Sequence, residues 1–227
     1  MTIFDFPFAW KILPQLLEGF VVTVEASLLG FLLAAVAGLL LAIARRSSRI
    51  WIRDPVIGVL EFVRSTPFLV QLFFAFFILP QYGITLEPFT IGIIALGIHY
   101  STYTAEVYRA GIEGVAKGQW EAAVALNYGF WDRWRRIILP QAIPPMVPVL
   151  GNYLITIFKE TPLLSTITVV EVMHVARLIG ADTYQFLEPM TLVGLLMLSI
   201  SLVSAYGVRR FDAYLRARTR TPHAAHG

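Results

Sequence analysis

The sequence contains no cysteine, which excludes disulfide bonds and thiolate metal sites. Three catalytic signatures are also missing: the G-x-x-x-x-G-K-[ST] loop that binds the phosphates of ATP, the H-E-x-x-H metal site and the G-x-S-x-G nucleophile turn. Glu171 and His174 have the spacing of two metal ligands on a helix, but further ligand residues are lacking around them. We therefore expect no enzyme activity, metal or cofactor in this chain itself.

Charged residues are scarce as well. They make up 15% of the chain, whereas apolar residues make up 57% and the mean hydropathy is +0.68. Soluble domains are about 45–50% apolar, so this composition indicates a membrane protein. The net charge of +3 is small, and we expect no nucleic-acid partner.

Five apolar stretches are long enough for helices that cross a bilayer, which needs roughly 20 residues. They are Gly19 to Ala44, Val56 to Leu79, Phe89 to about Tyr108, Val147 to about Phe158 with its flanks, and Pro189 to Val208. The sequence therefore predicts an all-α membrane protein with five transmembrane helices. The first stretch is too long for the apolar core of a signal peptide and contains Glu25, so we expect it to remain as a span.

Basic residues gather in alternate connections. Of 18 Lys and Arg, four lie between spans one and two, five between spans three and four, and five after span five (Arg45, Arg46, Arg49, Arg53; Arg109, Lys117, Arg133, Arg135, Arg136; Arg209, Arg210, Arg216, Arg218, Arg220). The connection from Thr161 to Glu188 has only Arg177, and the one from Pro80 to Pro88 has none. By the positive-inside rule, the N-terminus is outside and the C-terminus is in the cytoplasm.

This topology divides the chain into three parts. Residues 1–18 form an N-terminal segment whose Trp10 and Lys11 suit a helix lying at the outer membrane interface. Residues 19–208 form a transmembrane domain that includes a cytoplasmic loop, residues 109–146. Residues 209–227 form a basic cytoplasmic tail.

The cytoplasmic loop contains the segment EAAVALNYGFWDRWRRIILP, Glu121 to Pro140. Residues 119–126 are good helix formers, and Asn127 tolerates the left-handed conformation that often ends a helix. Pro140, Pro144, Pro145 and Pro148 then predict that no continuous helix runs from this loop into the fourth span. By its pattern alone, the segment also suits an ordinary amphipathic surface helix without a partner.

The segment resembles the EAA loop of permease subunits in binding-protein-dependent ABC importers. The family pattern is E-A-A, three residues, Gly, nine residues and I-x-L-P, and six positions match it in register: Glu121, Ala122, Ala123, Ile137, Leu139 and Pro140. Asn127 replaces the glycine. The resemblance implies a short cytoplasmic coupling helix that docks on an ATPase dimer, with these seven residues as the candidate docking site.

Two T-P steps share a local pattern. Arg64-Ser65-Thr66-Pro67 lies in span two, and Lys159-Glu160-Thr161-Pro162 ends span four. Interrupted helices in transporters commonly line the substrate path, because freed backbone groups need a cavity or a protein environment. Charges at membrane depth cost about 2.5 kcal/mol or more and need partners. Either Glu61, Arg64, Lys159 and Glu160 neutralise one another, or Arg64 or Lys159 meets a substrate carboxylate.

The third span ends in polar and aromatic residues. At helical spacing, Tyr100, Tyr103 and Glu106 share a side and are candidates to line a polar cavity. The alternatives are an aromatic belt at the membrane interface or hydrogen bonds between helices. His99 suits a bundle residue whose hydrogen bonds are satisfied better than a ligand-binding residue.

Nearly the whole chain resembles the polar amino-acid permeases of ABC importers. The runs HYSTYTAEVYRAGI and NYLITIFKETPLL look most similar to permeases for ectoine and hydroxyectoine. This resemblance implies the ABC type I importer permease fold in the inner membrane of a prokaryote, surrounded by lipid. It also implies a second permease, identical or homologous, a cytoplasmic ATPase dimer, an extracytoplasmic binding protein and a small polar solute. A secondary transporter or channel is the alternative.

Overall fold

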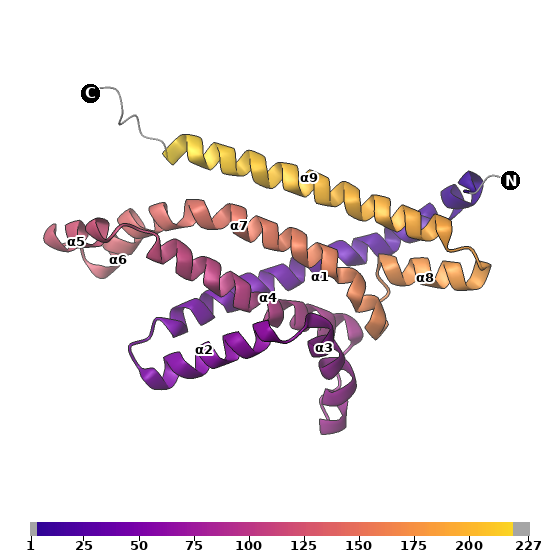
Figure 1. Ribbon diagram of the computed structural model, residues 1–227, viewed down its shortest axis with the longest axis horizontal. Coiled ribbons are helices and arrows are strands. Elements are labelled where there is room, and N and C mark those ends of the chain that lie inside the picture. The colour runs from indigo at the N-terminus through magenta and orange to yellow at the C-terminus, as the bar shows by residue number, and fades with distance from the viewer. Residues whose placement is uncertain (1–3, 220–227) are drawn as a thin grey trace.

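The computed structural model describes residues 4–219, and these residues are helical or in short connections. The long helices are α1 (Phe6–Arg45), α2 (Ile50–Ser65), α4 (Pro88–Glu113), α7 (Leu139–Glu160) and α9 (Leu187–Thr219). Shorter helices are α3 (Phe68–Phe73), α5 (Lys117–Ala125), α6 (Phe130–Arg133) and α8 (Val172–Thr183). The molecule is elongated, with α5 and α6 at one end and α8 with the N-terminus at the other (Figure 1).

Small residues allow α1 and α4 to pack closely. Gly38 of α1 and Gly97 of α4 lie so near the opposite helix that an added Cβ would collide with it, and Gly30 of α1 leaves only tight space for one. The Thr104 hydroxyl also donates to the carbonyl of Ala34 at 2.7 Å. Close approach through small residues is the usual way that helices associate in a membrane, where burial of apolar surface gives little driving force. Together, α1 and α4 form the rigid centre of the subunit.

The first helix does not divide at residue 18. Its 40 residues run without interruption from Phe6 to Arg45, about 60 Å at 1.5 Å per residue. Pro14 lies inside it and removes only one backbone donor. Likewise, the basic segment that follows residue 208 continues α9 up to Thr219, and residues 220–227 lie outside the described part. The interfacial position of residues 1–18 stays a prediction.

The predicted second span is broken at its T-P step, as the sequence indicated. Thr66 is extended because the ring of Pro67 excludes the helical conformation, and the two sides of the break are bent by 102°. After α3 follow a π-helical turn, Phe74–Ile78, and a 3-10 turn, Leu79–Tyr82. The second T-P step ends α7, and a 3-10 helix, Thr161–Ile167, follows. Val56 to Leu79 is therefore not one straight helix.

The expected interruption before the fourth span is wrong. The chain stays helical from Phe130 through a π-helical turn, Trp134–Ile138, into α7, although Pro144, Pro145 and Pro148 lie inside α7. Pro140 stands in the first turn of α7. The π turn and 3-10 adjustments are the local means by which membrane helices accommodate proline.

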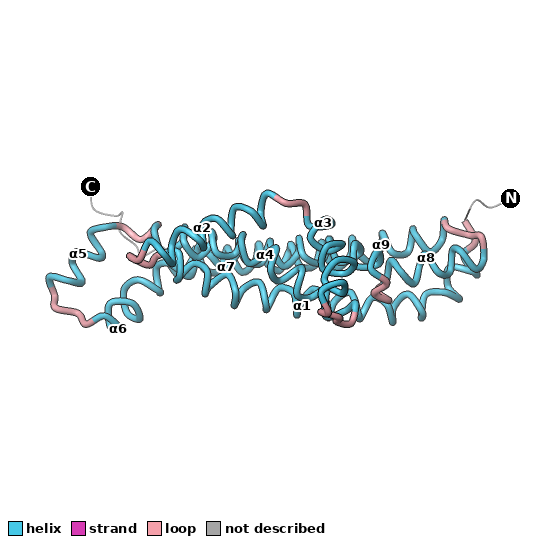
Figure 2. The backbone as a smooth tube through the Cα atoms, turned by 90° about the horizontal axis from the view of Figure 1, so that it is seen from below, coloured by secondary structure: helices cyan, strands magenta, loops and turns pink. Residues whose placement is uncertain are grey.

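By length and composition, three helical segments within residues 4–219 can cross a membrane: residues 6–45, 130–167 and 187–215. The bent pair at residues 50–82 is a possible fourth. The third predicted span corresponds to α4, whose 26 residues are long enough at about 39 Å but carry polar side chains. Figure 2 shows these helices running along the long axis, with loops at the ends and at the α2–α3 step. The in-and-out order of the spans stays a prediction.

Candidate functional site

The EAA segment forms α5 and a defined helix end. Asn127 has φ of 55°, the left-handed conformation predicted for it. Its N–H donates to the carbonyl of Val124 at 2.9 Å, and the N–H of Tyr128 donates to that of Ala123 at 3.0 Å. These two bonds are the Schellman arrangement, which normally has glycine at the left-handed position. Asn127 therefore performs the structural role of the family's glycine.

One side of α5 packs on its own chain. Ala123 is fully buried, and the Trp120 and Trp134 rings meet edge to face at 5.5 Å. The Gln141 amide also donates to Gln119 at 3.2 Å, which ties α5 to the start of α7. Ala123 thus lies on the side of α5 that packs against the rest of the chain and not on its exposed side.

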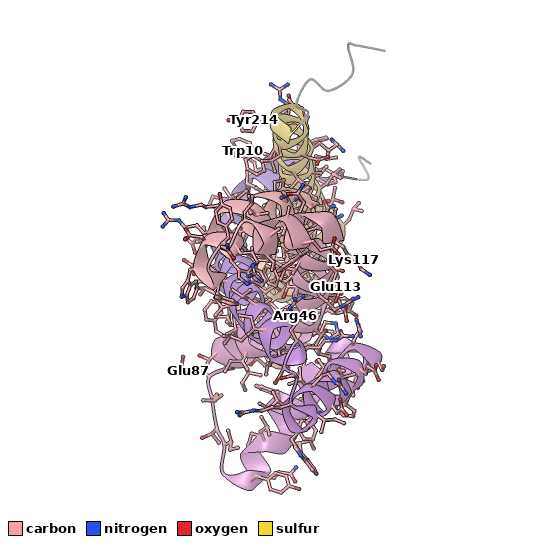
Figure 3. The ribbon with its side chains drawn as sticks, turned by 90° about the vertical axis from the view of Figure 1, so that its left-hand side faces the viewer. Trp10, Arg46, Glu87, Glu113, Lys117 and Tyr214 are labelled. Carbon is pink, nitrogen blue, oxygen red and sulfur yellow. The ribbon has the colours of Figure 1, made fainter. Side chains whose placement is uncertain are left out.

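The other side of α5 is open. Glu121, Ala122, Val124 and Leu126 are exposed, as are Asn127, Leu139 and Pro140, while Ile137 is half-buried beside the two tryptophans. Figure 3 views the molecule from this end, with Arg46, Glu113 and Lys117 labelled. The EAA positions thus divide into an exposed set that a partner can reach and a supporting set, Ala123 and Ile137.

Glu106 joins the ends of three helices. Its carboxylate pairs with Arg45 of α1, with Arg64 of α2 at 3.4 Å and with Arg109 of α4 at 2.7 Å. Arg109 also pairs with Glu113, one turn further on. The sequence suggested Glu61 or Glu160 as partners of Arg64. The structure instead pairs Arg64 with Glu106.

A groove of about 500 Å³ lies beside this ion cluster, between α4 and α7. Tyr103, Glu106 and Tyr153 line it, together with Met146 and Val149. Two predicted path residues, Tyr103 and Glu106, therefore share one cavity wall, and Tyr153 of α7 stands opposite them.

An aromatic cluster continues inward from the groove. The rings of Tyr100, Tyr103 and Tyr153 lie 5.7–6.2 Å apart between centroids, and His99 lies 5.2 Å from Tyr100. Tyr100 interacts with Glu160, and the Oε2 atom of Glu160 is buried without a hydrogen-bond donor from the described chain. Three of the predicted path residues, Tyr100, Tyr103 and Glu160, thus lie close together, and their role in the path stays a prediction.

Comparison with known proteins identifies the family. Residues 34–217 match the family described as the binding-protein-dependent transport system inner membrane component. The chain belongs to this family. It is therefore the multi-pass permease subunit of an ABC importer in the inner membrane, and ATP is hydrolysed on a separate subunit. The alternative of a secondary transporter or channel is not supported.

Similar proteins indicate that the importer to which this permease belongs is an amino-acid importer. A probable amino-acid ABC transporter permease, y4tG of Sinorhizobium fredii, is 43% identical over 214 residues, 94% of this chain and 93% of its own. The glutamine transport system permease GlnP of Escherichia coli is 34% identical over 216 residues, 94% of this chain and 98% of its own. A crystal structure of an amino acid ABC transporter with histidines matches 94% of this chain and 100% of its own, with a TM-score of 0.88 and 33% identity.

Two predicted path residues of the permease stand apart from the cluster. Glu61 is exposed on α2, and Lys159 is exposed near the end of α7. Lys159 continues an exposed polar stripe with Asn152 and Thr156, at intervals of four and three residues. The sequence reasoning missed this stripe, and it missed Tyr153. Helical spacing from Glu160 back through Ile157 to Tyr153 was the available signal.

Glu171 of the permease has a structural role. It is fully buried, caps α8 by accepting from the N–H groups of Met173 and His174 at 3.0 and 2.8 Å, and accepts from the Thr23 hydroxyl of α1 at 3.3 Å. Burial raises the pKa of this carboxyl to about 6, against these hydrogen bonds, which lower the pKa. The His174 ring faces the Ser165 carbonyl at 3.4 Å. Within residues 4–219, no group of three or more possible metal ligands occurs.

Proposed function

We propose that this permease carries a small zwitterion with a delocalised cation into the cytoplasm, and that ectoine or hydroxyectoine is the solute. The observation that supports this proposal is the Oε2 atom of Glu160, which is buried and accepts no hydrogen bond from residues 4–219, although Tyr100 interacts with the same carboxyl group. A buried acceptor without a donor costs about 1–3 kcal/mol, and more when it is charged. A cationic group with N–H donors that reaches Glu160 during transport relieves this cost.

The surroundings of Glu160 suit a planar cation. Tyr100, Tyr103 and Tyr153 offer ring faces and edges beside the carboxylate. Cations bind over aromatic rings, and a planar group with two parallel N–H donors matches a carboxylate in a bidentate manner. The amidinium of ectoine is a planar cation whose two N–H bonds diverge on either side of a methyl group, so it offers the carboxylate one N–H donor at a time. A guanidinium offers two parallel donors, so arginine is the competing solute, and one relative is the arginine transport system permease ArtQ of Bacillus subtilis, 33% identical over 206 residues.

The carboxylate of the zwitterion has Lys159 as its partner in this proposal. Lys159 follows Asn152 and Thr156 along one exposed side of a membrane-spanning helix. Polar side chains in such a helix face a cavity or another protein rather than lipid, because their exposure to lipid is costly. The proposed path therefore runs along this side of α7, and a second permease subunit closes it opposite the stripe.

In this proposal, ATP hydrolysis by the partner subunits acts on the permease through α5. In this proposal the exposed residues Glu121, Ala122, Val124 and Leu126 dock on the ATPase dimer, and an extracytoplasmic binding protein delivers the solute at the opposite end. ATP binding closes the ATPase pair and changes which side of the membrane the path opens to. In this proposal, the ATPase and the binding protein therefore meet the permease at opposite ends of its long helices (Figure 1).

The test is uptake of labelled ectoine by the complete importer in proteoliposomes. Glu160→Gln should lower uptake about tenfold or more, because the neutral amide cannot bind a cation as the carboxylate does. Glu61→Gln is the matched control, since Glu61 is an exposed acid of the same bundle, and it should leave uptake unchanged. Normal ectoine uptake by Glu160→Gln contradicts the site.

A comparison of labelled solutes identifies the substrate. The complete importer should take up labelled ectoine, and excess unlabelled glutamine should not block this uptake. If labelled arginine is taken up and labelled ectoine is not, the site still binds a delocalised cation and the ectoine assignment is wrong. If labelled glutamine alone is taken up, both are wrong.

A further inference from the structure

The ion cluster around Glu106 connects α1 and α4, which pack closely together, to α2, which is attached to them less closely. Arg45 ends α1 and Glu106 lies on α4, and these two helices are packed closely along their length. Arg64 lies in the last turn of α2. One carboxylate therefore links the rigid centre of the subunit to α2.

The helix α2 is weakly attached. Along all 16 of its residues, Leu60 is the one buried side chain, in contact with Ala42 of α1 and Ala105 of α4. Phe62, Val59 and Trp51 are exposed. Beyond Leu60, α2 meets the rigid centre through the partly buried Val56 and through the contact of Arg64 with Glu106.

The end of α2 that carries Arg64 is followed by a break with the features of a hinge. At Thr66 and Pro67 the backbone leaves the helix, and the side-chain amide of Gln71 donates to the freed carbonyls of Val63 and Thr66 at 2.6 and 2.9 Å. A break with its backbone groups already satisfied can change angle without exposing unpaired carbonyls to lipid. A groove of about 450 Å³ beneath the bend, lined largely by apolar side chains, leaves room for such movement.

Glu106 is also mechanically connected to α5. From Glu106, α4 continues to Glu113, and only residues 114–116 separate it from α5. Ile112 and Val115 are buried against Ile138 and Met146, so this corner is packed and not loose. Displacement of α5 therefore moves the end of α4 that carries Glu106.

We propose that Glu106 is a positioning residue that transmits the movement of α5 to α2, and that its contact with Arg64 opens during each transport cycle. Of its contacts, the one with Arg64 is the longest. Arg45 and Arg109 remain on Glu106 when Arg64 leaves, so no acid is left without a partner. This inference rests on the proposed docking of α5 to the ATPase.

Cysteine cross-linking tests whether α2 must separate from α4. The chain has no native cysteine, so L60C/A105C links α2 to α4 by a single disulfide in the complete importer. The matched control A42C/A105C links α1 to α4 and shares one of the two positions. All three residues belong to one contact cluster.

On oxidation, L60C/A105C should lose about tenfold or more of its ATP-driven uptake, and a reductant should restore it. Oxidised A42C/A105C should transport as it does when reduced. Uptake by the cross-linked L60C/A105C at its reduced rate overturns the inference, and so does an equal loss in A42C/A105C. Absence of ectoine uptake before any cross-linking counts against the proposed solute instead.

A second measurement does not depend on disulfide formation. Glu106→Gln should lower the amount of solute moved per ATP hydrolysed by about tenfold. Glu113→Gln is the control, because Glu113 pairs with Arg109 on the same helix and links no second helix. A residue with a merely structural role would reduce uptake and ATP hydrolysis together, so an unchanged ratio in Glu106→Gln overturns the inference.

Discussion

The guanidinium of Arg64 lies 3.4 Å from the carboxylate of Glu106, on a different helix. Arg45 and Arg109 pair with the same carboxylate. Arg64 is therefore already engaged in the permease, whereas Lys159 is exposed beside the proposed path. This arrangement assigns Arg64 to the coupling of helices and leaves Lys159 as the proposed partner of a solute carboxylate.

Removal of Arg64 should leave the complex assembled. In Arg64→Ala, Arg45 and Arg109 still neutralise Glu106, so the amount of complex in the membrane should stay within about twofold of wild type. Adding Glu61→Gln or Glu160→Gln should not change this amount. Quantification of purified complex from each variant checks this. A loss of complex in Arg64→Ala that either double variant restores would show that Arg64 serves that acid instead of Glu106.

The topology can be tested with single cysteines. Lys117→Cys should react with a membrane-impermeant maleimide only after the cytoplasmic side is exposed. Tyr184→Cys, at a position 90% exposed on the loop after α8, should react in intact cells. The physical reason is the gathering of basic residues in alternate connections. Labelling of position 117 in intact cells would reverse the assignment.

The docking side of α5 is best tested at Val124, which is 53% exposed, because Ala123 is fully buried. Val124→Asp should leave the permease in the membrane and remove the ATPase from the purified complex. Ala123→Asp should lower the amount of permease itself, since it buries an unpaired charge at a cost of several kcal/mol. Co-purification of the ATPase distinguishes the two. Normal ATPase content in Val124→Asp would place the docking surface elsewhere.

The stability of the permease should fall as Glu171 ionises. Because burial raises its pKa from 4.5 to about 6, the folded protein favours the protonated carboxyl. Its contribution to stability is complete below about pH 4.5, is lost as the pH rises through about 6, and amounts to about 2 kcal/mol. The unfolding temperature of the solubilised complex should decrease as the pH rises from 4.5 to about 6, and less so in Glu171→Gln. Identical pH dependence in both proteins would exclude Glu171 as the cause.

Features that depend on neighbouring residues were predictable from the sequence. The left-handed Asn127 and the break at Thr66-Pro67 follow from local backbone sterics, and the structure contains both. At the second T-P step, Thr161 keeps a helical conformation and the chain passes directly into a 3-10 helix. The run of prolines misled the prediction because a π-helical turn next to them keeps the chain helical. Proline removes a donor at a known position, but its effect on a membrane helix depends on how nearby turns adjust.

Features that depend on contacts between helices were not predictable. Arg64 has an acid three residues away, yet it pairs with Glu106, because α2 and α4 bring their ends together. Tyr153 joins Tyr100 and Tyr103 only through the packing of α7 on α4. Spacing within a single helix identified Tyr100, Tyr103 and Glu106 as sharing a side. It carries no information about which helix faces them.

The central claim is that ATP hydrolysis on a partner subunit drives a zwitterion along a path that contains Glu160. The most direct measurement is uptake of labelled ectoine by proteoliposomes that hold the complete importer and its binding protein, with no membrane potential. The account predicts accumulation when ATP is enclosed, none with a non-hydrolysable analogue, and a loss of about tenfold or more in Glu160→Gln. Equal accumulation without ATP, or equal accumulation in Glu160→Gln, would contradict it.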